Sequence, residues 1–278
     1  MIKYIKLLSE YLFNKKTLVL LILTALVPSV LIGIYLRPME ELFVLTSMDA
    51  IKSLELNFFE IYWRTSGFNE STVMTIISLF VLLCAITVMV ATVDRHMRIG
   101  DLKFRNPFRR INENFWVVFP ILAILIVVKE VFDILALLFA YLWIYVTTGF
   151  TAILLTSISY ILVYGVFCIC VAMCVSWIPH TLNTGLSAPK TFSSSVKLMR
   201  GKILPLALMI GLPCIPIALL NVLGIIVGGV LNMFTCAVTY FVLMVYLVPL
   251  IYVVYYDAMG LEREDLNNIS IWKRPYVR

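Results

Sequence analysis

Charged side chains are scarce in this chain of 278 residues. Only 14% of the residues are Asp, Glu, Lys or Arg, whereas 62% are apolar, and the mean hydropathy is +1.00. A soluble domain has about 25% charged and about 45–50% apolar residues. The composition therefore excludes an ordinary water-soluble globule. The abundance of Leu, Ile, Val and Phe also excludes a disordered chain.

Residue patterns that carry catalysis or metal binding are missing as well. The chain has no G-x-S-x-G, H-E-x-x-H or P-loop motif, and only two histidines, His96 and His180. Two histidines on separate segments, without neighbouring ligand residues, do not supply a metal site. All six cysteines fall in apolar stretches, which is typical of packing residues rather than of a disulfide framework. We therefore expect no enzymatic activity, no cofactor and no metal ion.

Long uncharged stretches are the main feature that is present. Five stretches of 15 to 56 residues contain no Asp, Glu, Lys or Arg. About 20 apolar residues in a helix cross a hydrocarbon core of about 30 Å, and a stretch that is apolar on all sides favours a helix over a barrel strand. The two longest stretches each divide in two, at Thr147–Gly149 and near Gly224–Leu231. The sequence thus predicts an all-α polytopic transmembrane helix bundle over 18–256, with six spans at about 18–36, 73–93, 115–140, 152–176, 203–222 and 233–256.

Positive charges lie almost entirely on one side of these spans. Segments 1–17, 94–113, 179–202 and 257–278 hold 18 of the 22 Lys and Arg residues. Segment 37–72 holds three, together with six acids. By the positive-inside rule both termini are cytoplasmic, 37–72 is an outer segment and 257–278 is a cytoplasmic tail. This distribution explains the net charge of +6 without nucleic-acid binding. We expect a multi-pass protein of a cell membrane, of bacterial inner or plasma membrane type.

Residues 1–17 have the pattern of an amphipathic helix that lies in the membrane interface. Such a helix directs its lysines toward anionic lipid headgroups. It either leads into the first span or docks a partner. The apolar residues share one helical face and the lysines lie elsewhere: Ile5, Leu8, Tyr11 and Leu12 against Lys3 and Lys6.

Two cytoplasmic segments are basic, and each leads into a span. Helices are predicted to begin at Pro107 and near Pro189, because Asn or Ser before an early Pro is typical of a helix start. The basic side chains are candidate contacts for anionic lipid headgroups or for a protein partner such as an ATPase subunit. They are Arg109, Arg110, Lys190, Lys197 and Arg200.

Three charged residues fall inside the third predicted span. Lys129 and Asp133 are four residues apart and can pair on one helical face, and Glu130 follows Lys129. A charge at the bilayer centre costs roughly 2.5–3.5 kcal/mol on insertion scales, so such residues pair or line a wet cavity. Lys129, Glu130 and Asp133 are therefore a candidate intramembrane polar site on a substrate or proton path. The alternative is an ion pair at the outer interface, at the end of a tilted span.

Three patterns in the second half of the chain carry a resemblance to a known family. They are Asn106-Pro107-Phe108-Arg109-Arg110, the segment from Ala188-Pro189-Lys190 to Arg200-Gly201, and Tyr255-Tyr256-Asp257 with the charged residues that follow it. Over roughly residues 94–266 the chain resembles the membrane domain that is fused to some bacterial glycerophosphodiester phosphodiesterases and also occurs as a stand-alone protein. The resemblance implies a stand-alone integral membrane protein. The segments outside the spans are too short for the catalytic barrel, so it implies neither phosphodiesterase activity nor a catalytic residue.

These features predict a non-enzymatic integral membrane protein, a scaffold or accessory subunit that acts through its lipid-facing and basic cytoplasmic surfaces. The alternative is the transmembrane permease subunit of an exporter, with a separate ATPase docked on its cytoplasmic segments. An intramembrane enzyme is the least favoured class, because paired acid–base or nucleophilic groups are missing from the inner half of the spans.

Overall fold

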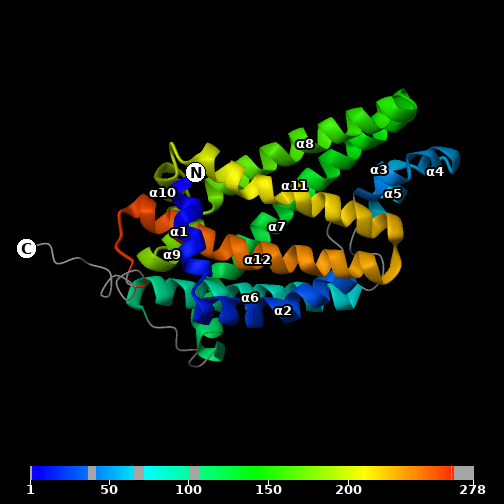
Figure 1. Ribbon diagram of the computed structural model, residues 1–278. Coiled ribbons are helices and arrows are strands. Elements are labelled where there is room, and N and C mark those ends of the chain that lie inside the picture. Colours follow the sequence, from blue (N-terminus) through cyan, green and yellow to red (C-terminus); the bar gives the residue numbers. More distant parts are fainter. Residues whose placement is uncertain (1, 37–41, 66–71, 101–106, 264, 266–278) are drawn as a thin grey trace, which may run out of the picture.

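The computed structural model is a bundle of helices (Figure 1). It describes residues 2–36, 42–65, 72–100, 107–263 and 265, without the side chains of Lys15 and of residues 107–113, and no strand occurs in these ranges. The long helices are α2 (Lys15–Tyr35), α6 (Thr72–Ile99), α7 (Pro107–Val146), α8 (Gly149–Cys174), α11 (Ile203–Val227) and α12 (Gly229–Met259). The short helices are α1 (Ile2–Leu12), α3 (Phe43–Thr46), α4 (Met48–Ser53), α5 (Phe58–Thr65), α9 (Trp177–Thr184) and α10 (Ala188–Leu198).

Within the described residues, five helices are long and apolar enough to cross a membrane, as expected of a multi-pass membrane protein. They are α2, α6, α8 continued into α9, α11 and α12. The all-α class is confirmed, and these helices coincide with five of the six predicted spans. The remaining span, 115–140, falls inside α7, a helix of 40 residues that carries Lys129, Glu130 and Asp133.

The helix boundaries follow the predicted turns closely. Only Thr147 and Thr148 separate α7 from α8, and Gly228 separates α11 from α12. Gly228 has φ of 74°, in the left-handed region that favours glycine. Helix α7 ends at Val146 rather than at 140, because no glycine or proline lies between Ala140 and Val146 to end it earlier. The predicted helix starts at Pro107 and near Pro189 are confirmed by α7 and α10.

The long helices form a ring in chain order, which a contact between α12 and α2 closes. In Figure 1, α2, α6 and α12 run side by side, whereas the α7–α8 hairpin diverges from them toward its tip. Short helices gather at both ends of the bundle. Helices α1, α9 and α10 lie at one end, and α3, α4 and α5 lie at the other, where they contact α7 and α8.

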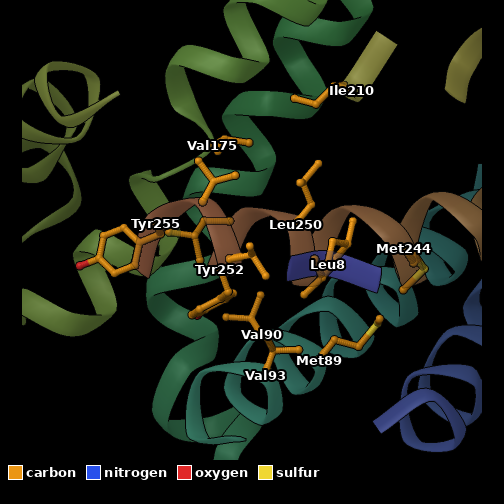
Figure 2. Packing of buried hydrophobic residues seen from close by; sticks show 14 of the residues in the cluster. Leu8, Met89, Val90, Val93, Val175, Ile210, Met244, Leu250, Tyr252 and Tyr255 are labelled. Carbon is orange, nitrogen blue, oxygen red and sulfur yellow. The ribbon is translucent and has the colours of Figure 1, made fainter. Parts of the chain in front are cut away.

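Two apolar clusters hold these elements together. In the larger cluster, side chains of α1, α6 and α12 meet (Figure 2), among them Leu8, Met89 and Leu250. The smaller cluster joins α3–α5 to the outer half of the α7–α8 hairpin through residues such as Val44 and Ala140. Along α7, the charged residues 129–133 lie between the two clusters, because Ile121 belongs to the larger cluster and Ala136 to the smaller.

Candidate functional site

The charged residues of α7 form a polar cluster with α8. Lys129 Nζ pairs with the Asp133 carboxylate one turn further on, as predicted. Tyr164 Oη of α8 donates a hydrogen bond to Asp133 Oδ1 at 2.9 Å. The Asp133 side chain is 3% exposed and that of Lys129 is 29% exposed. The buried carboxylate thus has one partner on its own helix and one on the neighbouring helix.

The depth of this cluster follows from the helix rise. Asp133 lies about 20 Å along α7 from its end at Val146, and Tyr164 lies about 22 Å along α8 from its start at Gly149. These distances from the tip of the hairpin are shorter than the thickness of a hydrocarbon core, about 30 Å.

Glu130 lies next to this ion pair in the sequence. Its side chain is half-buried, and both Lys129 and Asp133 act on it electrostatically.

The predicted cytoplasmic contacts lie apart from this cluster. Lys190 and Lys197 are exposed on α10, and Arg200 is exposed in the turn that follows. Arg109 and Arg110 belong to the first turn of α7, and their side chains lie outside the described residues. The structure thus separates a buried polar cluster on α7 and α8 from an exposed basic surface on α10.

A second polar site, which the sequence did not predict, joins α1 to the end of α12. Asp257 accepts a hydrogen bond from Tyr4 Oη at 2.7 Å and pairs with Lys202 Nζ at 2.9 Å and with Lys3 Nζ. Burial, and then the hydrogen bond to Asp257, raise the pKa of Tyr4, so its phenol keeps the proton that it donates. We call Asp257 with Lys3, Tyr4 and Lys202 the Asp257 clasp. The sequence pattern Tyr255-Tyr256-Asp257 marked this position only as part of a family resemblance.

Tyr11 makes a further connection from α1 to the bundle. Its hydroxyl lies 3.2 Å from Nδ1 of His96 on α6. The guanidinium of Arg263 lies 5.7 Å from the centroid of the Tyr11 ring, a cation–π contact. Burial raises the pKa of Tyr11, which therefore stays neutral beside these partners. Helix α1 is thus fixed to α6, to α12 and to the segment after α12.

A third polar set links α11 to α12 within their apolar stretches. Asn221 Nδ2 donates to Thr239 Oγ1 at 2.6 Å, and Cys236 Sγ donates to Asn221 Oδ1 at 3.3 Å. All three residues are buried. The amide of Asn221 in a long uncharged stretch was the sequence signal for this site. Because these groups satisfy one another, they act as a polar link between the two helices.

We expect a double-mutant cycle of Asn221→Ala and Thr239→Val to give a coupling of about 0.6 kcal/mol, the average for hydrogen bonds between membrane helices, and at most about 1.7 kcal/mol. The cycle is measured by unfolding of the purified protein in detergent mixtures. Strictly additive effects would show that the two side chains do not stabilise each other.

Neither a metal site nor a known relative indicates the function of this chain. Across the part of the chain that the structure describes, no three His, Cys, Asp or Glu side chains are arranged to hold a metal ion. The six cysteines are free thiols. Comparison of the chain with protein-family models, with curated proteins and with solved structures finds no match.

Proposed function

We propose that the chain is a six-span integral membrane protein with cytoplasmic termini, and that it acts as a non-enzymatic scaffold or accessory subunit. Helix α7 supplies the third span. The distribution of Lys and Arg supports this orientation, because α1, α9, α10 and the last residues of α12 lie at one end of the bundle (Figure 1). The described part of the outer segment, α3–α5, lies at the opposite end (Figure 1).

The observation that supports the scaffold function is an exposed basic surface at the end of the bundle where α1, α9 and α10 lie. The Asp257 clasp fixes α1 and the start of α11 to α12. Beside it, Lys190, Lys197 and Arg200 remain exposed to solvent. A basic surface on fixed elements is suited to an acidic protein partner, because complementary charge speeds and orients association.

Charge reversal of this surface tests the proposal. We expect a stoichiometric partner to be recovered with the wild-type protein after cross-linking in native membranes, and recovery to fall about tenfold in the variant K190E/K197E/R200E. The melting temperature should not change, since all three side chains are exposed. Lys52→Glu, an exposed lysine on α4 at the other end, is the matched control and should keep the partner. Equal recovery with all three proteins would refute the scaffold function.

The family resemblance is in keeping with this proposal. A stand-alone member of the membrane-domain family of bacterial glycerophosphodiester phosphodiesterases would be an integral protein of the bacterial inner or plasma membrane. The resemblance remains a prediction, and no catalytic role follows from it for any residue.

The polar cluster on α7 and α8 favours a second function, the permease subunit of an exporter that works with a separate ATPase. Lys129, Glu130 and Asp133 form an ionisable group in a span, which is typical of a substrate or proton path. Recovery of a stoichiometric ATPase subunit in the cross-linking experiment would favour this function over a scaffold. In that case Glu130→Gln should slow ATP-driven export at an unchanged melting temperature.

A further inference from the structure

Helix α1 has two apolar faces instead of the single face that its pattern predicted. Tyr4, Leu8 and Tyr11 are each at most 8% exposed and pack on the bundle. Ile5, which the pattern placed with Leu8 and Tyr11, lies on the other side. The second apolar face includes Phe13 just beyond the helix, and it is open: Ile2 is 82% exposed, Ile5 48% and Phe13 83%.

The position of α1 next to α2 places this second apolar face where lipid can cover it. Only Phe13 and Asn14 separate α1 from α2, and the side chain of Asn14 caps α2 by accepting a hydrogen bond from Lys16 N at 3.2 Å. Figure 1 shows α1 lying across one end of the bundle. Because α2 is long and apolar enough to cross the membrane, α1 is held where the chain enters the lipid. Interfacial helices bury their apolar face about 5–10 Å into the boundary of headgroups and acyl chains.

The charges beside this face match an anionic lipid. Lys3 and Lys202 both pair with Asp257, and their side chains remain 67% and 30% exposed. Lys6 is also exposed on α1. In an anionic lipid no choline cation balances the charge of the headgroup phosphate, so its oxygens can accept from ammonium groups as a carboxylate does and replace Asp257 as the partner of the two lysines.

We infer that α1 is a strap that responds to lipid charge. Its face of Ile2, Ile5 and Phe13 inserts into the adjoining leaflet, and anionic headgroups compete with Asp257 for Lys3 and Lys202. In a neutral membrane the Asp257 clasp holds α1 on the bundle. In an anionic membrane the headgroups also bind Lys3 and Lys202, so α1 is held in part by lipid. This inference goes beyond the scaffold function and does not depend on it.

Hydrogen–deuterium exchange of the full chain in nanodiscs tests the competition. In nanodiscs of phosphatidylcholine alone, Asp257→Asn should speed exchange of the α1 amides about tenfold, because the clasp is then the main electrostatic restraint. In nanodiscs of phosphatidylglycerol and phosphatidylcholine in equal parts, the same variant should change exchange less than about twofold. Lys3→Gln, at an exposed side chain, should act in the same direction. An equal effect of Asp257→Asn in both lipids would overturn the competition.

A separate variant tests the insertion of the second apolar face. I5S/F13S should speed exchange of α1 in both kinds of nanodisc, because it removes lipid contacts without touching the packed face. Phe59→Ser is the matched control, since Phe59 is 78% exposed on α5 at the far end of the bundle, and it should leave α1 unchanged. Unchanged exchange in I5S/F13S would overturn the insertion of α1.

Discussion

Substituting Gly33 by Ala lowers the free energy of unfolding by about 1–3 kcal/mol, the usual range for overpacking in a well-packed interior. A Cβ atom at this position would lie 2.6 Å from the carbonyl oxygen of Met233 and 2.6 Å from Cβ of Ala237. Neither atom is the end of a flexible side chain, so α2 and α12 have to move apart. Titration with a denaturing detergent, followed by circular dichroism, measures the loss.

Gly165 of α8 provides the matched control. A Cβ atom there would meet nothing within 4 Å. Because Ala is favoured over Gly inside a helix by about 0.5–1 kcal/mol, Gly165→Ala should leave stability unchanged or raise it slightly. Equal effects of the two substitutions would mean that α2 and α12 do not rely on a close approach at Gly33.

The second large effect is expected at the ion pair in α7. Lys129→Met should destabilise the protein by about 3–5 kcal/mol, because it leaves the buried Asp133 carboxylate without its opposite charge. The double variant K129M/D133L removes both charges, and it should therefore be more stable than K129M alone. Thermal unfolding of the three proteins in one detergent gives the comparison. Lys197→Met, at an exposed lysine of α10, is the control and should change stability by less than about 0.5 kcal/mol.

The same double variant separates a structural role of the pair from a functional one. Suppose that K129M/D133L is more stable than K129M, still cross-links to the partner and still supports export. The ion pair then has a structural role alone. Regained stability with lost export would assign the pair to the transport path. If the double variant is as unstable as K129M, the unpaired Asp133 charge is not the cause of the lost stability.

The helices and their boundaries could be predicted to a large extent from local sequence. Apolar stretches in lipid have to form helices, since no water is present to satisfy the backbone. Thr147–Gly149 and Gly228 mark the turns, because residues there leave the helical conformation readily. The pair of Lys129 and Asp133 was likewise predictable, since residues four apart share one helical face.

The tertiary partners of these residues could not be predicted in this way. Tyr164 lies 31 positions from Asp133, and Tyr4 lies 253 positions from Asp257, so no local period relates them. The two faces of α1 show the same limit, since an apolar stripe does not reveal whether protein or lipid covers each of its residues.

The sequence by itself thus determined which segments are helices, which of them suit a membrane and where positive charge collects. Composition and spacing suffice for these properties, because the exclusion of backbone polar groups and of charge from lipid acts on each segment separately. Only the tertiary structure decided that Asp257 gathers two lysines and a tyrosine, that Tyr164 completes the cluster of α7, and that α1 keeps an open apolar face. These features depend on how helices from distant parts of the chain pack against one another, and that packing is a property of the whole bundle.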